Sequence, residues 1–249
     1  MSVLFISDLH LEDSRPDITE AFIYFLSEKK AGCEALYILG DFFENWVGDD
    51  EQTPLHRIII DQLRTYTHAN IPVFFLHGNR DFLIGLQFSE ESGCRLLHEE
   101  SIVTLYGQPV LLMHGDSLCT NDKGYMNFRK NARNPVWQQA FLTRPLEDRI
   151  KVARQLRELS MAQNKGKTEA IMDVTPDEVV TVMEKHQTRY LIHGHTHRPA
   201  IHSLDLNQGR GQRIVLGDWD KSGWCLEVSP SASDSEPLFL NLYSFPLAG

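Results

Sequence analysis

The chain has 249 residues, 42% of them hydrophobic, which is enough to bury a large core without disulfides or structural metals. Its formal net charge of −10 argues against a general nucleic-acid-binding protein. Its four cysteines form no CxxC pair, which argues against a cysteine zinc site and favours a reducing compartment. The opening residues lack a signal peptide's basic start, and no apolar run reaches the roughly 18 residues of a membrane span, so we expect a cytoplasmic protein.

The charge is unevenly distributed along the chain. Residues 121–170 contain eleven Lys/Arg and five Asp/Glu, whereas the rest contains thirteen and twenty-nine. A basic segment inside an acidic protein suggests an anionic partner at that segment, although a solvated helical surface would have the same composition.

The first third of the chain alternates strand-like and helix-like segments. Asp17 and Glu20 form a plausible capping box at the start of the first helix. This order predicts a sheet of parallel strands with helical crossovers. The strands are expected at 3–7, 35–39 and 72–76, and the helices at 17–29, 55–67 and 81–91.

The remainder predicts a second set of strands, interrupted by a basic helical block at 122–168. We therefore expect a single two-sheet α/β domain over residues 1–249, with 122–168 as a helical insertion. A further helix is predicted at 176–187, and strands at 94–98, 101–107, 108–115, 189–193, 200–204, 213–217, 224–228 and 238–245.

Polar residues follow five of the predicted strands at the point where each strand ends. In open α/β sheets ligands bind beyond the carboxyl ends of the strands, so these tips could converge on one site. Each tip alone is also a common turn sequence, since Asp, Asn and Gly favour turns. The tips are Asp8-Leu9-His10, Gly40-Asp41, Gly78-Asn79-Arg80-Asp81, His114-Gly115-Asp116 and Gly194-His195-Thr196-His197.

These side chains offer carboxylate, amide and imidazole ligands without a thiolate. Such a mixed oxygen and nitrogen set suits Mn²⁺, Fe or Zn²⁺, although the histidines could instead be buried and satisfied by neighbours. The candidates are too many for one ion and suit two ions if a carboxylate bridges them. The candidate metal ligands are Asp8, His10, Asp41, Asn79, His114, His195 and His197.

The five ordered tips resemble the motifs of the calcineurin-like metallophosphoesterases, D-x-H, G-D, G-N-H-[DE], a strand-end His and G-H-x-H. The resemblance implies a four-layer αββα sandwich with a helical lid. It also implies one metal held by Asp8, His10, Asp41 and His197. The second metal would be held by Asp41, Asn79, His114 and His195, so that Asp41 would bridge the two metals.

One position departs from the family pattern. Most members have a His after the motif asparagine, to protonate the leaving oxygen or stabilise the transition state, whereas this chain has Arg80. Arginine cannot act as a general acid, but it can hold phosphate oxygens with paired hydrogen bonds. We therefore predict Arg80 as the catalytic side chain, and a pyrophosphate substrate whose phosphate leaving group needs no proton.

Nearly the whole chain resembles one branch of that family, the UDP-2,3-diacylglucosamine hydrolases of lipid A synthesis. The sequence segments that carry this resemblance include LYILGDFFENWVGDD (36–50), HGNRDFL (77–83) and LIHGHTHRPA (191–200). The resemblance implies a lipid-linked UDP-sugar substrate, release of UMP and lipid X, two Mn²⁺ ions, and peripheral attachment to the cytoplasmic face of the inner membrane. The implied substrate contacts are Asn79, Arg80, Asp122, Ser160, Asn164, Lys167 and His195.

The basic block suits such a lid, because it combines apolar residues with Lys and Arg that could bind phosphates or an anionic membrane. Two other readings remain open: the same fold acting on another nucleotide or phosphodiester, and a scaffold without catalysis. We predict no nucleic-acid partner and find no signal for a protein partner. The sequence leaves the roles of His193 and Asp116 undecided, although Asp116 could accept a hydrogen bond from a metal-binding histidine.

Overall fold

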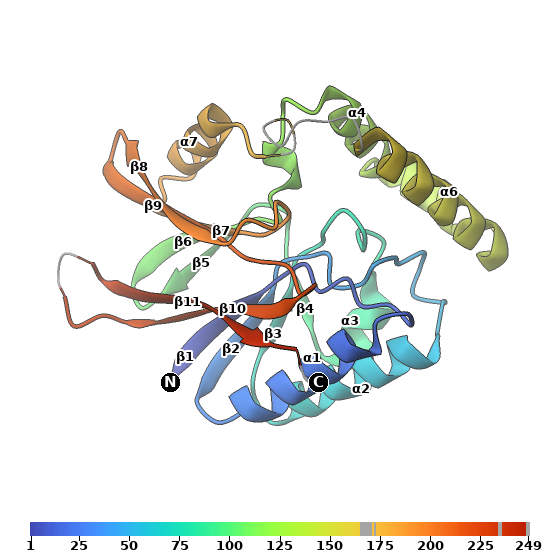
Figure 1. Ribbon diagram of the computed structural model, residues 1–249, viewed down its shortest axis with the longest axis horizontal. Coiled ribbons are helices and arrows are strands. Elements are labelled where there is room, and N and C mark those ends of the chain that lie inside the picture. The colour runs from blue at the N-terminus through green and yellow to red at the C-terminus, as the bar shows by residue number, and fades with distance from the viewer. Residues whose placement is uncertain (165–170, 172, 234–235, 248–249) are drawn as a thin grey trace.

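The computed structural model describes residues 1–164, 171, 173–233 and 236–247, and it contains two stacked β-sheets flanked by helices (Figure 1). Its strands are β1 (Ser2–Ile6), β2 (Cys33–Ile38), β3 (Val73–Phe75), β4 (Arg95–Leu96), β5 (Ser101–Leu105), β6 (Gln108–Leu112), β7 (Tyr190–His193), β8 (Ala200–Leu206), β9 (Gly209–Val215), β10 (Ser222–Pro230) and β11 (Leu238–Pro246). Within these residues the two sheets have the strand orders β11-β10-β1-β2-β3-β4 and β5-β6-β7-β9-β8.

Parallel pairing runs through the middle of both sheets. Strands β1 to β4 pair in parallel, as do β6, β7 and β9. The rings of Phe5, Tyr37 and Phe74 stack across β1, β2 and β3, with centroids 4.8 Å and 4.6 Å apart. The predicted crossover order of the first three strands is confirmed, and the carboxyl ends of parallel strands share one edge of each sheet.

Helices cover the outer face of each sheet. The helical segments are α1 (Pro16–Lys29), α2 (Pro54–His68), α3 (Leu86–Ser92), the 3₁₀ turn η1 (Asp116–Leu118), α4 (Lys123–Ala132), α5 (Pro135–Leu142), α6 (Leu146–Asn164) and α7 (Pro176–Lys185). Helices α1 to α3 pack against the first sheet, and α7 with η1 packs against the second. A third core, which includes Phe5, Leu112 and Ile214, fills the space between the sheets. This is the predicted four-layer αββα sandwich.

The predicted capping box of the first helix and the predicted start of the third helix are wrong. Helix α1 begins at Pro16, and Asp17 lies inside its first turn rather than capping it. The Asp17 carboxylate instead accepts hydrogen bonds of 3.0 and 2.8 Å from the Arg15 guanidinium. Helix α3 begins at Leu86 instead of residue 81, because Asp81 folds back into the preceding loop and accepts hydrogen bonds from the backbone of Gly78 and Phe42.

The basic segment forms the helices α4, α5 and α6, which lie beyond the strand ends (Figure 1). We call these three helices the lid. Phe141 of α5 is buried against the core beneath the first sheet, and Trp137 and Ile150 pack beside it. The assignment of 122–168 as an insertion within one domain stays a prediction, and residues 165–168 lie outside the described chain. Among the described residues no helix has both the length and the hydropathy to cross a bilayer.

Candidate metal centre and substrate pocket

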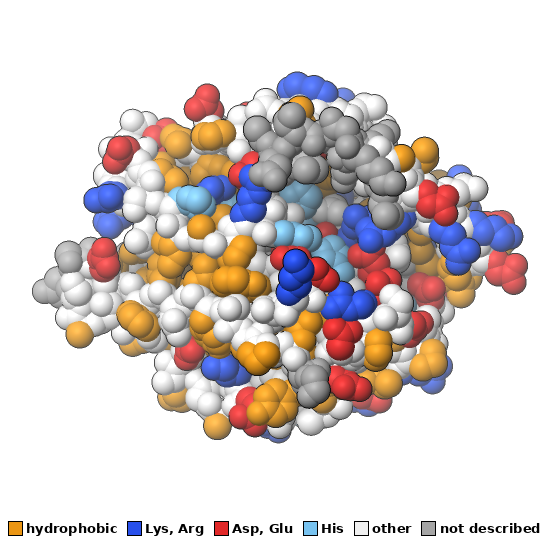
Figure 2. Space-filling view, viewed as in Figure 1, with side chains coloured by type: hydrophobic (Ala, Val, Ile, Leu, Met, Phe, Trp, Pro, Cys, Tyr) orange, Lys and Arg blue, Asp and Glu red, His pale blue; other side chains and the backbone are white. Residues whose placement is uncertain are grey.

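The strand-end loops bring the predicted ligands into two adjoining groups. Asp8, His10 and His197 form one group, and Asp41, His114 and His195 form the other. Within each group one ligand atom per residue lies within 4.8 Å of the others. Figure 2 shows histidine side chains exposed at the centre of one face, beside acidic and basic side chains.

Asp41 belongs to the second group and also faces the first. Its Oδ2 lies 3.9 Å from His10 Nε2, and its Oδ1 lies 3.6 Å from His114 Nε2. Asn79 adds a further oxygen to the second group, since its Oδ1 lies 3.0 Å from the same His114 nitrogen. One carboxylate that faces both groups with different oxygens is placed as a ligand shared by two cations would be.

The backbone at these residues adopts a conformation that L-amino acids rarely take. Non-glycine residues seldom have positive φ, and such outliers collect at functional sites because surrounding structure must hold them. The sequence alone gave no sign of this feature. The ligand residues with positive φ are Asp8 at 56°, His10 at 50°, Asp41 at 49°, His195 at 68° and His197 at 54°.

Glycines allow the ligand loops to approach one another closely. A β-carbon at Gly78 would lie 2.1 Å from the backbone nitrogen of Asp41, and one at Gly194 would lie 2.2 Å from Asp8 Oδ2. Gly40 has a φ of +84°, which also favours glycine. The glycines that precede Asp41, Asn79 and His195 thus permit this close approach.

Asp81 holds two of these loops together, a role that the sequence reading missed. It is fully buried, and its carboxylate accepts 2.7 Å hydrogen bonds from the backbone nitrogens of Gly78 and Phe42. Burial and the nearby charge of Asp41 raise the pKa of Asp81 to about 6. Its place directly after Arg80 in the GNRD motif was the available signal.

The electrostatics of the first group favour positive charge. Burial would raise the pKa of Asp8, but the hydrogen bond and charge of His197 and the charge of His114 hold it well below its usual range. Burial would lower the pKa of His197, but Asp8 and Asp218 raise it to about 9. Buried carboxylates that stabilise a proton on an imidazole would equally stabilise a cation in its place, so the donor set fits divalent metal ions.

His195 and His193 stand in different surroundings from His197. Burial and the charge of His114 lower the pKa of His195 to about 4, so its imidazole is neutral and able to bind a metal. His193 is fully buried, with Nδ1 2.8 Å from the carbonyl oxygen of Gly194, and it belongs to neither ligand group.

In three of the candidate ligand histidines an oxygen lies within 3.5 Å of the other ring nitrogen. His114 Nδ1 lies 2.8 Å from the carbonyl oxygen of Leu39. The suggestion that Asp116 accepts a hydrogen bond from a metal-binding histidine is wrong, because Asp116 accepts from Tyr125 and Arg129 of α4 at 2.5 and 2.9 Å.

The partners of the other two histidines are carboxylates that the sequence reading missed. His10 Nδ1 lies 2.9 Å from Glu44, and His197 Nδ1 lies 3.5 Å from Asp218. Neither carboxylate follows a strand directly in a recognisable motif, so no local pattern marked them.

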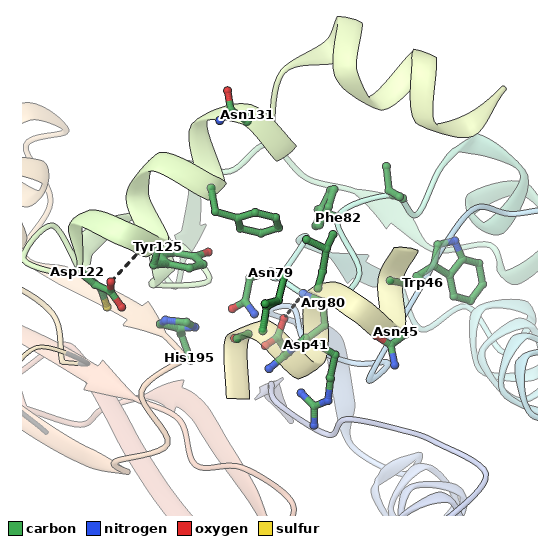
Figure 3. A pocket seen from close by; sticks show the side chains of 18 of the residues that line it. Asp41, Asn45, Trp46, Asn79, Arg80, Phe82, Asp122, Tyr125, Asn131 and His195 are labelled. Carbon is green, nitrogen blue, oxygen red and sulfur yellow. Dashed lines mark hydrogen bonds between the residues drawn. The ribbon is translucent and has the colours of Figure 1, made fainter. Parts of the chain in front are cut away.

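A cavity of about 690 Å³ adjoins the ligand groups and extends beneath the lid. Figure 3 places Asn79 and Arg80 near its middle, with His195, Tyr125 and Asp122 toward one end and Trp46 at the other. Most of the predicted substrate contacts therefore line one pocket, and they are Asn79, Arg80, Asp122, Ser160 and His195.

The individual contacts refine that picture. Arg80 Nε is buried without a hydrogen-bond partner, although the backbone nitrogen of Arg80 donates to Asp41 Oδ1 at 2.8 Å. Asp122 caps α4 by accepting a 3.0 Å hydrogen bond from the backbone nitrogen of Tyr125. Asn164 is the last residue of helix α6, and its side chain lies outside the described part of the structure. The whole of Lys167 also lies outside it.

Comparisons with known proteins agree with this geometry. A model of the calcineurin-like phosphoesterase family matches residues 1–199. A Marinobacter nauticus protein named UDP-2,3-diacylglucosamine hydrolase is 57% identical over 96% of this chain and 99% of its own. A Pseudomonas aeruginosa protein of the same name is 54% identical over 95% of this chain and 99% of its own.

Among solved structures, an archaeal phosphodiesterase aligns with 98% of this chain and 100% of its own at 13% identity, with a TM-score of 0.46, too distant to bear on the assignment. The family model and the two relatives assign the chain to a family. The chain belongs to the calcineurin-like phosphoesterase family, in the group of the UDP-2,3-diacylglucosamine hydrolases.

Proposed function

We propose that the protein hydrolyses the pyrophosphate bond of UDP-2,3-diacylglucosamine and releases UMP and 2,3-diacylglucosamine 1-phosphate, or lipid X, in lipid A synthesis. One observation carries the proposal: two metal-ligand groups open into a cavity of about 690 Å³ that a basic helical lid covers. The names of relatives that match almost the whole chain support the same substrate.

Two divalent ions fit the ligand groups, and we propose Mn²⁺ because the ligands are oxygens and imidazole nitrogens. When bound, such ions supply a hydroxide at neutral pH and offset the charge of the phosphates. Asp41 would belong to both sets. The first set is Asp8, His10, Asp41 and His197, and the second is Asp41, Asn79, His114 and His195.

Arg80 is the side chain that we assign to the reaction itself. Its guanidinium lines the pocket and its Nε has no protein partner, so its hydrogen-bond donors are available to phosphate oxygens. A fixed positive charge stabilises the negative charge that develops in the transition state without transferring a proton. This chemistry suits a leaving phosphate monoester better than a leaving alkoxide.

The lid provides the surfaces that a diacylated sugar needs. The rings of Trp137 and Phe141 stack at 5.0 Å and line the cavity, where they can cover acyl chains. Asp122, Ser160, Asn164, Lys167 and His195 are the proposed contacts to the sugar phosphate, and Asn79 and Arg80 join them at the pyrophosphate.

We also propose that the lid attaches the protein to the cytoplasmic face of the inner membrane. Val136 is 75% exposed and Leu142 is 41% exposed at the ends of α5, close in sequence to Lys130 and Arg144. Apolar side chains beside cations are typical of segments that bind anionic membranes. Sedimentation with vesicles should show binding that rises with the anionic lipid content and falls with salt, and salt-independent or absent binding would contradict this attachment.

A mass-spectrometric assay tests the function. Purified protein should convert UDP-2,3-diacylglucosamine to UMP and lipid X with Mn²⁺, and chelation should abolish turnover until Mn²⁺ is restored. A protein that cleaves a nucleotide or bis-p-nitrophenyl phosphate but not the lipid substrate would favour another phosphoesterase activity. A metal-loaded protein that cleaves none of them would favour a scaffold, and turnover without metal would contradict the two-metal centre.

A further inference from the structure

Glu44 connects a candidate metal ligand to the lid. Glu44 lies in the loop after β2 and is only 4% exposed. Oε2 lies 2.9 Å from His10 Nδ1, and Oε1 lies 2.5 Å from the Arg157 guanidinium of α6. The two oxygens of one buried side chain thus face the metal centre and the lid respectively.

We propose that Glu44 is a positioning residue that couples metal binding to the seating of helix α6. The proposal rests on the metal centre proposed above. A carboxylate held beside Nδ1 of a metal-binding histidine orients the ring, and its negative charge makes the other nitrogen a better ligand. His10 already presents Nε2 toward the first ligand group, 3.4 Å from His197 Nε2.

Arg157 provides the lid side of this coupling. A buried carboxylate without a cationic partner is unfavourable, and Arg157 is the lid residue that contacts Glu44. When α6 is seated, Glu44 is held against His10 with its charge compensated. Thermodynamic linkage makes this coupling reciprocal. If the seated position of α6 raises the affinity for metal, bound metal must raise the population of seated α6 by the same factor.

The lid also offers a matched control. Arg149, on the same helix, forms an ion pair with Asp50 and donates a 2.6 Å hydrogen bond to the carbonyl oxygen of Val47. Asp50 belongs to neither ligand group. Asp50→Asn therefore weakens an anchor of α6 without touching His10 or Glu44.

Mn²⁺ affinity, measured by titration of the metal-free protein with electron paramagnetic resonance of the free ion, tests the proposal without activity. Glu44→Gln keeps the shape but loses the negative charge, and it should weaken binding about 10- to 100-fold, as loss of such a histidine partner does. Arg157→Ala should weaken it about fivefold, at the low end of measured couplings between sites. The double variant should bind no more weakly than Glu44→Gln alone, because Arg157 acts through Glu44.

Hydrogen exchange of α6 with and without Mn²⁺ measures the reciprocal effect. Mn²⁺ should slow exchange over residues 150–160 in the native protein and in Asp50→Asn, but not in Arg157→Ala. Unfolding temperatures of the metal-free variants show whether each one folds. Native Mn²⁺ affinity in a folded Glu44→Gln variant would overturn the positioning role of Glu44. If Asp50→Asn lowered the Mn²⁺ affinity as much as Arg157→Ala, the effect would come from general stability of the lid, and the specific coupling through Glu44 would be overturned. A native protein that binds no Mn²⁺ would instead contradict the metal centre itself.

Discussion

The strand-end loops and the lid hold their functional side chains in different ways. In the loops, backbone contacts fix the ligands: both Asp8 oxygens accept from the backbone nitrogen of His195, at 3.2 and 3.0 Å, and Asp41 accepts from the backbone of Arg80. Besides the apolar contacts around Phe141, arginine side chains attach the lid: Arg133 donates to the carbonyl of Gly78 at 2.8 Å, and Arg149 donates to that of Val47.

This difference separates two tasks. Ligands must stay within a few tenths of an ångström to hold metal ions, and glycine contacts with positive-φ backbone provide that rigidity. A lid that admits a long acylated substrate must move, and side-chain ion pairs can part without unfolding the sandwich. Substitutions of the candidate ligands and of the glycines between them should therefore damage metal binding or stability, whereas lid substitutions away from the Arg157–Glu44 contact should leave metal binding near native.

The largest effect should come from the ligand that both groups share. Asp41→Ala removes the oxygens that face His10 and His114, so we expect turnover to fall on the order of 10³-fold or more, with loss of bound metal. Steady-state kinetics and metal analysis of the same preparation measure both. A variant with near-native rate and metal content would contradict the bridging assignment.

Arg80→Ala should spare the metals but not the reaction. Loss of one group that stabilises transition-state charge costs on the order of 10²–10³ in rate, and Arg80 is not among the ligand residues. The kcat for UDP-2,3-diacylglucosamine should fall accordingly while metal content stays native. Metal loss in this variant would show that Arg80 supports the ligand loops instead.

A pair of glycine substitutions compares the stability of the two regions directly. Gly78→Ala puts a methyl group 2.1 Å from the Asp41 nitrogen, and such overpacking should destabilise the metal-free protein by about 3 kcal/mol. Gly124→Ala in α4 meets nothing closer than 3.7 Å and should stabilise by up to about 1 kcal/mol. Urea unfolding measures both, and equal effects would remove the contrast between rigid loops and tolerant lid.

The predicted substrate contact at Lys167 should have the smallest effect and the most selective one. Lys167→Ala should lower kcat/KM for the lipid substrate roughly 10- to 150-fold, as expected for losing a hydrogen bond to a charged group. If the native enzyme cleaves bis-p-nitrophenyl phosphate, that rate should change little, because this small substrate needs no lid. Equal losses on both substrates would place Lys167 in support of the metal centre, and no loss on the lipid would make it a solvated residue.

Much of the site was predictable because strand ends carry recognisable motifs. Asp8, Asp41 and His195 each follow a predicted strand, and parallel pairing brings such ends together without knowledge of the full fold. The αββα layers followed from the family resemblance, whereas the alternation of strands and helices alone gave only a two-sheet α/β domain.

The residues that support the ligands were less predictable. Glu44 and Asp218 face ligand histidines across the fold, and no short sequence pattern encodes a contact that depends on tertiary packing. Arg149 belongs to the basic block whose Lys and Arg we expected to bind phosphates or a membrane, yet it is buried and forms an ion pair with Asp50. Composition reports that a segment is basic, but only the packing decides which charges are already engaged.

The contact between Asp8 and His195 has a consequence for biosynthesis. These residues are 187 positions apart, and each ligand group includes either His195 or His197, so neither group is complete until almost four fifths of the protein has left the ribosome. Contacts this distant in sequence form late and slowly. We therefore expect the nascent chain to acquire its metals only after the second sheet has docked on the first, which makes metal uptake a final event of folding.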